Sequence, residues 1–532
     1  MPMSKVSVSD QKSITDAISK ARLLSGPGEI VLGLEVSEKG YATSPFSVKR
    51  SLLREGHVHL RGRTRSGKTS LAIAPMLEQL LVPETRYYSD KNKQQRRLDV
   101  KDPVFIFDLG GDLALFNFAK RQADDHDRKF RFLSLDRQED WHFFDPFQAA
   151  GSGGEDRIIR MANLLIQAFH LDYGLIYGGS YYTQRNLSAL LRVASRLQDS
   201  DAKEKVLNID DLLFYLKKTG QRDEEEIRFA FQFLAQYDQL KPPPGSEDKQ
   251  IDLRRAIDDG EVIYFFCPTM GEATTARQIA GLGLYTLINA AMQRIRTRPE
   301  SERHKPLPHA WVFVDEFQEL AGRSFAALLA QSSKFGISLI MANQTTTQLK
   351  SRDLDLADVV RDNTHVKVYF TVTGKDDLEG LQVFSKDAKL KLSRTSESMA
   401  EFRSKITIGE SEQITPTLKK DVILDTSSTH KHCFVILDSG TGHIEPTRVV
   451  TDYAIDAEDY IKYKSTPLPR GERDPQGTPR DKPDSTTPLW KRKRQLGVPS
   501  GRSADMDAML DTKRKQEIPE FAASKLQGTT GS

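Results

Sequence analysis

The chain has 532 residues and a formal net charge of only +3, with 38% hydrophobic and 28% charged residues. This length allows several domains and a large buried core, and the near-neutral balance excludes a chain that is basic over its whole surface. The two cysteines, Cys267 and Cys433, have no CxxC partner, which argues against a disulfide framework and against a cysteine-ligated zinc site.

The longest apolar stretches, at 262–267 and 337–342, are far shorter than the ~20 residues that a membrane-spanning helix requires. The N-terminal residues contain no apolar signal core. We therefore expect a cytoplasmic protein that reaches a membrane only through a partner.

Strand-like and helical segments alternate along much of the chain. Residues 1–50 are weakly patterned, with a short strand predicted at 29–35. A strand at 57–62 precedes a glycine-rich loop and a helix at 70–81. Further strands are predicted at 103–107, 130–135, 261–268, 310–317, 337–344, 365–372 and 433–440. This alternation predicts an α/β fold with a mostly parallel central sheet.

Two segments differ from this pattern. Between about 155 and 254, apolar residues recur at helical spacing, which predicts an inserted all-α domain. From about 461 the chain is rich in Pro, Ser, Thr, Gly and charge, which predicts a disordered basic tail. Its clusters at 491–494 and 513–515 either contact DNA phosphates or are merely solvated. The expected organisation is an N-terminal segment (1–50), a discontinuous nucleotide-binding domain (51–154 and 255–460), the inserted domain (155–254) and the tail (461–532).

The strongest motif is a P-loop between a predicted strand and a predicted helix. The segment from Gly62 to Thr69 fits G-x-x-x-x-G-K-[ST]. Glycines let the backbone approach phosphates closely, and the N–H groups that follow supply positive potential. We predict that Lys68 reaches the β- and γ-phosphates of ATP and that the Thr69 hydroxyl binds Mg²⁺. The predicted nucleotide-binding residues are Gly62, Arg63, Thr64, Arg65, Ser66, Gly67, Lys68, Thr69 and Ser70.

Polar residues at the ends of three predicted strands complete the candidate site. Asp315 is predicted to hold Mg²⁺ together with Thr69, and Glu316 to orient and deprotonate the attacking water. Gln344 either contacts the γ-phosphate or the attacking water, or caps the next turn. Asp108, before a Gly-Gly turn, either lines the nucleotide site or caps that turn. The predicted catalytic set is Lys68, Asp315, Glu316 and Gln344.

The motifs resemble those of the type IV secretion coupling proteins, the DNA-pumping ATPases of conjugation that are related to FtsK- and HerA-like translocases. The resemblance runs from about residue 33 to about residue 450. It is carried, in the family's order, by HVHLRGRTRSGKTS, FIFDLGGDL, FLSLDRQEDWHFFDPF, GGSYYTQRNLSALLRVASRL, WVFVDEFQELAG, FGISLIMANQTTTQLKSR and VVRDNTHVKVYF. P-loops and acidic pairs occur in many NTPases. The DEF segment with a glutamine-containing strand after it and a helical insertion before it is more specific.

The resemblance implies a RecA-like P-loop ATPase that uses ATP and Mg²⁺ and forms a homo-hexamer around DNA. It also implies a relaxase or other secretion proteins as partners, and a peripheral position at the inner membrane through a partner. The family's transmembrane helices have no counterpart in this sequence, and Gly110 stands where the family usually has a lysine. Candidates for a cation donated to the neighbouring subunit's ATP site are Arg323, Lys334 and Arg361. The alternatives are a HerA-like DNA-processing ATPase without a secretion role, and an adaptor that binds nucleotide as a structural switch.

Overall fold

The computed structural model describes residues 6–470, with gaps at 92, 137–139, 149–154, 172–182, 193–208, 211–212, 215–224, 244, 272, 351–354, 373, 386, 401–402, 417 and 439–444. Contacts divide the chain into one unit from Met1 to Gly471 and a second from Glu472 to Ser532. The second unit, with the basic clusters at 491–494 and 513–515, lies outside the described residues. Helix α15 (Ala457–Ser465) extends into the segment expected to be tail, and Leu468 beyond it is buried. The packed part of the chain therefore reaches past residue 461.

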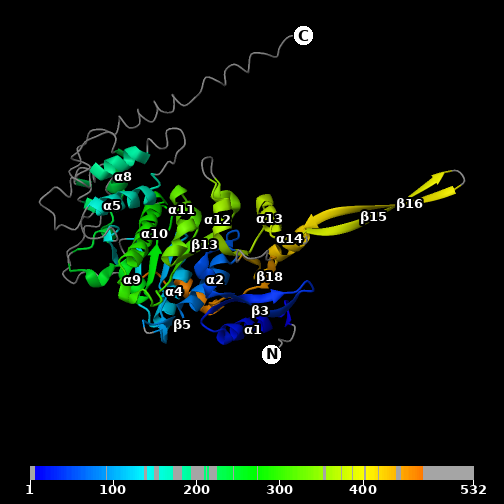
Figure 1. Ribbon diagram of the computed structural model, residues 1–532, viewed down its shortest axis with the longest axis horizontal. Coiled ribbons are helices and arrows are strands. Elements are labelled where there is room, and N and C mark those ends of the chain that lie inside the picture. The colour runs from blue at the N-terminus through cyan, green and yellow to red at the C-terminus, as the bar shows by residue number, and fades with distance from the viewer. Residues whose placement is uncertain are drawn as a thin grey trace, which may run out of the picture. The chain divides into compact units, whose positions relative to one another are not determined.

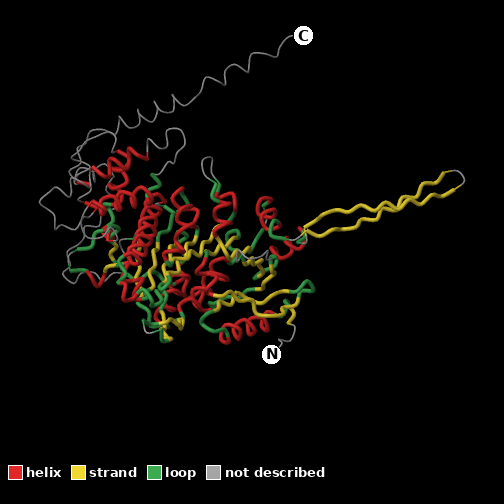
Figure 2. Tube along the Cα trace, viewed as in Figure 1, coloured by secondary structure: helices red, strands yellow, loops and turns green. Residues whose placement is uncertain are grey.

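The centre of the first unit is a 12-stranded sheet in the order β1-β3-β2-β18-β17-β14-β4-β13-β12-β7-β11-β8 (Figures 1 and 2). Neighbouring strands from β14 to β8 pair in parallel. They are β4 (His57–Arg61), β7 (Val104–Asp108), β8 (Phe130–Ser134), β11 (Val262–Phe266), β12 (Ala310–Asp315), β13 (Ile337–Asn343) and β14 (Thr364–Tyr369). Their apolar side chains are almost all buried, as expected for parallel strands covered on both faces. The predicted α/β fold with a mostly parallel sheet is confirmed.

Helices cover both faces of this sheet, and successive residues of a strand face opposite layers. In β12, Val312 and Val314 pack in the cluster that contains α10 (Ala273–Arg296) and α11 (Arg323–Gln331). Trp311 and Phe313 pack in the cluster that contains α3 (Ala74–Leu81) and α4 (Leu113–Asp125). Further helices of this unit are α2 (Arg50–Glu55), α9 (Leu253–Asp259), α12 (Ala357–Asn363), α13 (Lys375–Gln382) and α14 (Lys420–Ser428).

The N-terminal segment extends the same sheet. Strands β1 (Val6–Ser7), β3 (Tyr41–Lys49), β2 (Glu29–Val36), β18 (Thr447–Val450) and β17 (His432–Leu437) pair antiparallel and continue it beyond β14. Helix α1 (Gln11–Leu24) buries Ile14 and Ile18 against this extension. Gly33 permits the close pairing of β2 and β18, because a Cβ there would lie 2.2 Å from the Val450 carbonyl oxygen.

Much of the predicted helical insertion lies outside the described residues. Within it, α5 (Glu155–Ala168), residues 183–192 and α8 (Glu225–Leu234) are helical. Strand β9 (Phe143–Phe144) before the insertion pairs in parallel with β10 (Gln250–Ile251) after it. The chain therefore leaves and re-enters the sheet domain at one place.

Two hairpins were not predicted from the sequence, and each forms a two-stranded sheet of its own. They are β5 (Glu84–Ser89) with β6 (Gln95–Val100), and β15 (Asp387–Ala400) with β16 (Arg403–Pro416). Among the described residues, no helix combines the length and the apolar character needed to cross a membrane.

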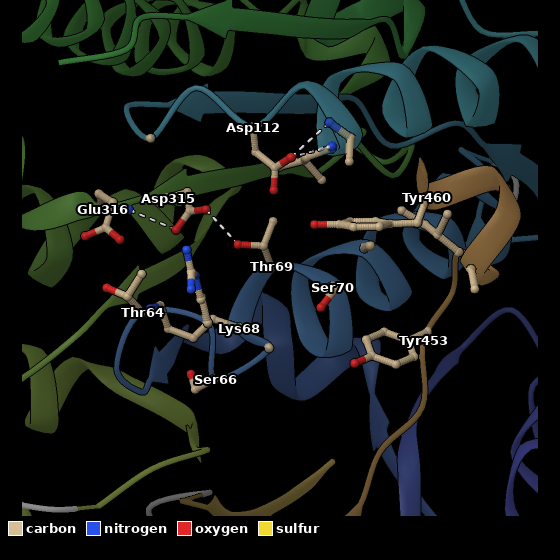
Figure 3. Close-up of a pocket in the computed structure, with 18 of the residues that line it drawn as sticks. Thr64, Ser66, Lys68, Thr69, Ser70, Asp112, Asp315, Glu316, Tyr453 and Tyr460 are labelled. Carbon is tan, nitrogen blue, oxygen red and sulfur yellow. Dashed lines mark hydrogen bonds between the residues drawn. The ribbon is translucent and has the colours of Figure 1, made fainter. Parts of the chain in front are cut away.

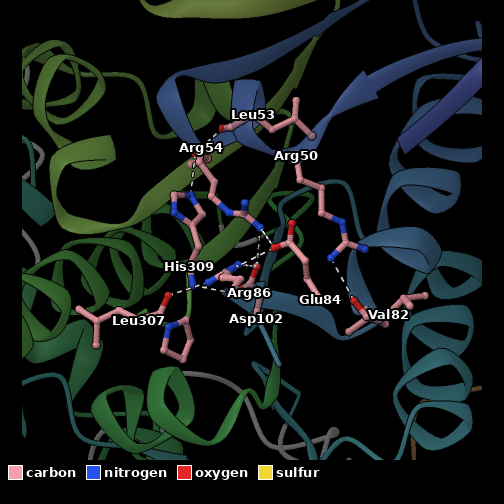
Figure 4. A network of polar contacts seen from close by, with 12 residues as sticks. Arg50, Leu53, Arg54, Val82, Glu84, Arg86, Asp102, Leu307 and His309 are labelled. Atoms are coloured by element: carbon pink, nitrogen blue, oxygen red, sulfur yellow. Dashed lines mark hydrogen bonds and ion pairs between the residues drawn. The ribbon is translucent and has the colours of Figure 1, made fainter. Parts of the chain in front are cut away.

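A buried polar network ties together segments at the N-terminal ends of β7 and β12 (Figure 4). Asp102 is 1% exposed; it pairs with Arg86 at 2.5 Å and accepts a hydrogen bond of 2.8 Å from the His309 backbone N–H. Glu84 pairs with Arg54 of α2 and, at 2.9 Å, with Arg86. Since each carboxylate has more than one cationic or N–H donor, the charges are compensated although they are buried.

Candidate functional site

The P-loop connects β4 to a π-helical turn, η1 (Lys68–Ile73), that continues into α3. Arg65 (φ 64°) and Gly67 (φ 98°) have left-handed backbones, and such residues let successive N–H groups converge on an anion. Gly62 is required for a different reason, because a Cβ there would lie 2.4 Å from Ser66 Oγ. The loop lies at the C-terminal end of β4, which has β13 on one side and β14 on the other.

Lys68 is buried, and its Nζ donates a hydrogen bond of 2.7 Å to the Gly62 carbonyl oxygen. Burial lowers the pKa of Lys68, while the nearby carboxylates of Asp315 and Glu316 oppose that shift. A buried cation close to converging N–H groups creates a strongly positive site in a medium of low dielectric constant. This position suits the phosphate contact that the sequence predicts for Lys68.

Asp315 ends β12 beside the start of η1 (Figure 3). Its Oδ2 accepts a hydrogen bond of 2.9 Å from Thr69 Oγ1, and its Oδ1 accepts one of 3.0 Å from the Glu316 backbone N–H. Burial, followed by the nearby carboxyls of Asp108 and Glu316, raises the pKa of Asp315 to about 7, against the opposing effects of Lys68 and Thr69. The folded chain therefore holds this carboxylate at a cost, which a bound cation would offset.

The oxygens of Thr69 and Asp315 suit Mg²⁺ bound together with a nucleotide. Mg²⁺ keeps several waters and typically takes one or two protein oxygens in addition to phosphate oxygens. A hydroxyl and a carboxylate already in contact with each other offer such a pair. In the described part of the chain, no group of three or more His, Cys, Asp or Glu side chains forms a cage made of protein ligands alone.

Glu316 has a left-handed backbone (φ 57°), which is unfavourable for a residue with a side chain. Its carboxylate accepts a hydrogen bond of 2.7 Å from Gln318 Nε2. Gln344 Nε2 lies 3.3 Å from each carboxylate oxygen. The two amides therefore hold the carboxylate in one orientation. Gln318 was not predicted from the sequence. Its position two residues after Glu316 is the only sequence feature that connects it to the site.

Gln344 is brought to the acidic pair from the end of β13. Its backbone N–H donates a hydrogen bond of 2.9 Å to Oε1 of Gln348, the third residue of the turn η9 (Thr346–Leu349). Its side chain contacts Glu316, so Gln344 connects the end of β13 to the predicted base. Asn343, its neighbour, is fully buried and contacts His59 Nε2 at 2.8 Å, which is a structural contact between β13 and β4.

Asp108 caps a turn. It is fully buried, and it accepts hydrogen bonds from the backbone N–H groups of Gly110 (3.0 Å), Gly111 (2.7 Å) and Asp112 (2.8 Å) and from the Tyr264 hydroxyl (2.8 Å). Burial raises its pKa, although these hydrogen bonds oppose the shift. Of the two roles left open by the sequence, the structure favours the turn cap.

A cavity of about 700 Å³ lies over the P-loop. One part of its lining consists of residues 64–70 with Asp315 and Glu316. Gly110, Asp112, Ala114 and Leu115 form a second part, and His430, Tyr453, Ile455, Ala457, Tyr460 and Ile461 form a third. Of the predicted site residues, Gly62, Arg63 and Gln344 are not in this lining. This third part of the lining was not predicted from the sequence, because its residues lie far from the P-loop in the chain and form no recognisable motif.

The three cations proposed to complete a neighbouring site lie apart from this cavity. Arg323 begins α11, Lys334 lies in the turn after it, and Arg361 lies in α12. Arg361 pairs with acids of its own helix, Asp358 at 2.7 Å and Asp362 at 3.1 Å. None of the three is among the residues that line the cavity of their own chain.

Residues 256–445 match the family model of the type IV secretion-system coupling protein DNA-binding domain. This match confirms the resemblance to the type IV coupling proteins. The matched segment contains β12, with Asp315 and Glu316, and β13, with Gln344 after it. No curated protein sequence matches the chain.

Several solved structures are similar at low sequence identity. The bacterial conjugative coupling protein TrwBdeltaN70, in an unbound monoclinic form, has 15% identity and a TM-score of 0.46, with 79% of this chain and 89% of that chain covered. The plasmid coupling protein TrwB in complex with ADP and Mg²⁺ has 13% identity and a TM-score of 0.48, covering 85% and 95%. VirB4 of Thermoanaerobacter pseudethanolicus has 13% identity and a TM-score of 0.44, covering 82% and 99%. Likenesses this distant assign no function to this chain.

Proposed function

We propose that this chain is an ATP hydrolase of the coupling-protein type, which uses ATP to recruit or move a DNA or nucleoprotein substrate for transfer through a type IV secretion system. The observation that carries the proposal is the convergence of the P-loop with the acidic pair: Thr69 contacts Asp315 at 2.9 Å, and Glu316 follows at once. The match of residues 256–445 to the coupling-protein DNA-binding domain supports DNA as the partner.

The chemistry follows from the positions of the side chains. The P-loop N–H groups and Lys68 bind the phosphates and stabilise the charge that develops on them. Thr69 and Asp315 would hold Mg²⁺, which would supply positive charge to the phosphate oxygens. Glu316 accepts a proton from the attacking water, and the amides of Gln318 and Gln344 keep its carboxylate in place.

Lys68→Ala and Glu316→Gln test this division of roles. Lys68→Ala removes a phosphate contact, so nucleotide binding and hydrolysis are both expected to fall. Glu316→Gln keeps the size and polarity of the side chain, so ATP is expected to bind while turnover falls at least about 100-fold. Equal turnover by wild-type protein and Glu316→Gln would refute the role of Glu316 as the base.

The wider proposal includes a homo-hexamer with DNA in its channel, a relaxase or other secretion protein as partner, and a cytoplasmic position held at the inner membrane through a partner. ATP hydrolysis with and without DNA separates a DNA-driven motor from an adaptor that uses nucleotide as a switch. Co-purification with a relaxase or with a nuclease separates the secretion role from that of a HerA-like DNA-processing ATPase. An ATPase rate that DNA leaves unchanged would contradict the motor.

A further inference from the structure

The cavity over the P-loop changes in character along its length. Figure 3 shows Lys68, Asp315 and Glu316 at one end and Tyr453 and Tyr460 at the other, with Thr69 and Ser70 between them. Ile455 and Ile461 add aliphatic surface to the tyrosine end. One end is thus charged and suited to phosphate, and the other is aromatic and aliphatic. Ligand pockets commonly combine a large apolar surface with a few charged groups that fix orientation.

Contacts with neighbouring segments hold Tyr453 in place at the tyrosine end of the cavity. Asp452, next to Tyr453, pairs with Lys431 at 2.6 Å, and its carbonyl oxygen accepts a hydrogen bond of 3.1 Å from Arg22 of α1. The Tyr453 hydroxyl lies 2.9 Å from His430 Nε2, and Lys431 Nζ lies 4.8 Å from the centre of the Tyr453 ring. The residues just before β17 therefore fix the ring, and α1 fixes the backbone beside it.

Tyr460 is fixed through the helix that carries it. Helix α15 packs against α4, and Asn117 of α4 donates hydrogen bonds of 2.9 Å to the carbonyl oxygens of Tyr463 and Thr466. Tyr460 itself packs against the core cluster around α3 and α4. Ile461, its neighbour on the cavity side, is 68% exposed.

We propose that Tyr453, Tyr460 and Ile461 form the subsite for the base of the bound nucleotide. A nucleobase is a flat aromatic ring, and aromatic side chains bind it by stacking. The order of groups along the cavity matches a nucleotide, whose phosphates lie at one end and whose base lies at the other. The inference rests on the proposed nucleotide binding, and it assigns a role to residues 453–461, which lie outside the segment that matches the coupling-protein family model.

The test compares ADP with pyrophosphate, which has the phosphate groups without the base and the ribose. Binding to the full chain is measured by calorimetry in the presence of Mg²⁺. Tyr453→Ala and Tyr460→Ala are each expected to weaken ADP binding about tenfold, because stacking on one ring has about this effect. Ile461→Ala is expected to weaken ADP binding by a smaller factor. Pyrophosphate affinity is expected to remain as in the wild-type protein for all three variants.

Control variants separate a base contact from a loss of structure. Tyr460→Phe keeps the ring and is expected to bind ADP as the wild type does, and so is Tyr87→Ala, which removes a tyrosine that is 65% exposed on β5. If Tyr460→Ala disturbs α15, Tyr453→Ala and the exposed Ile461→Ala still decide the question. The proposal is overturned if Tyr453→Ala and Ile461→Ala bind ADP with wild-type affinity, or if they lose ADP and pyrophosphate equally. Failure of the wild-type chain to bind either ligand would instead overturn the proposed function.

Discussion

Replacing Asp315 by asparagine should stabilise the folded chain while abolishing its proposed chemistry. The folded state raises the pKa of Asp315 from 3.8 to about 7, chiefly by burial. An acid with a raised pKa keeps its proton in the folded chain at a pH where the unfolded chain has released it. Stability is therefore lost as the pH rises from about 4 to about 7. Asparagine does not ionise, so Asp315→Asn escapes this loss.

The size of the effect follows from the same shift. About 3 pKa units at 1.36 kcal/mol each give roughly 4 kcal/mol at pH 8, and roughly 2 kcal/mol at pH 5, where the pH has risen only part of the way from 3.8 to 7. Relaxation of the site makes both figures upper limits. The advantage of Asp315→Asn over the wild type should thus grow from pH 5 to pH 8.

Urea unfolding at the two pH values, without nucleotide or Mg²⁺, measures this difference. The fluorescence of Trp311, which is buried in the same strand β12, reports unfolding near the site. Asp124→Asn, which changes an exposed carboxylate of α4, is the matched control and should show no growing advantage. If the urea midpoint of Asp315→Asn differs from that of the wild type by the same amount at both pH values, the reasoning is refuted.

Four further predictions address the site, the assembly and the fold. Mg²⁺-dependent binding of ADP should strengthen as the pH rises through about 7, because the cation binds the ionised form of Asp315; calorimetry at pH 6 and pH 8 measures this, and an unchanged affinity would contradict it. Gln318→Ala should lower the rate of ATP hydrolysis while ADP affinity stays constant, because the amide of Gln318 contacts the carboxylate of Glu316; parallel loss of both would indicate a structural role. If neighbouring subunits complete the site, mixing Glu316→Gln subunits into wild-type protein should reduce activity by more than their fraction, and strictly proportional loss would point to a self-sufficient monomer. Asp102→Ala should destabilise the chain by about 1–3 kcal/mol in thermal or urea unfolding, because the buried backbone N–H of His309 and the half-buried Arg86 lose their bonds to Asp102, whereas Asp99→Ala, in an exposed pair with Arg97, should have little effect.

The sequence predicted the strands of the parallel sheet, because these strands are continuous apolar runs that end in polar residues. It also predicted the P-loop and the acidic pair, because the residues of each motif are close together in the sequence. It could not place residues that reach the site through the fold alone. Tyr453 and Tyr460 line the cavity because the chain after β18 leads into α15, which packs against α4, and nothing in their local pattern indicates this packing. The joining of residues 29–49 to the central sheet depends in the same way on pairing between β2 and β18.

Buried charge is compensated at the N-terminal ends of the parallel strands but not at their C-terminal ends. This difference supports a functional site at the C-terminal ends. At the N-terminal ends, Asp102 is surrounded by arginines and an N–H donor, so its charge is compensated within the fold. At the C-terminal ends, Asp315 has a raised pKa, Lys68 a lowered one, and Glu316 a left-handed backbone. Each of these features is unfavourable for the folded chain by itself, and the proposed binding of a phosphate and a cation would compensate the charges of Lys68 and Asp315. Unfavourable features therefore gather at the end of the sheet where the proposed nucleotide binds, whereas the charge of Asp102 at the other end is compensated within the fold.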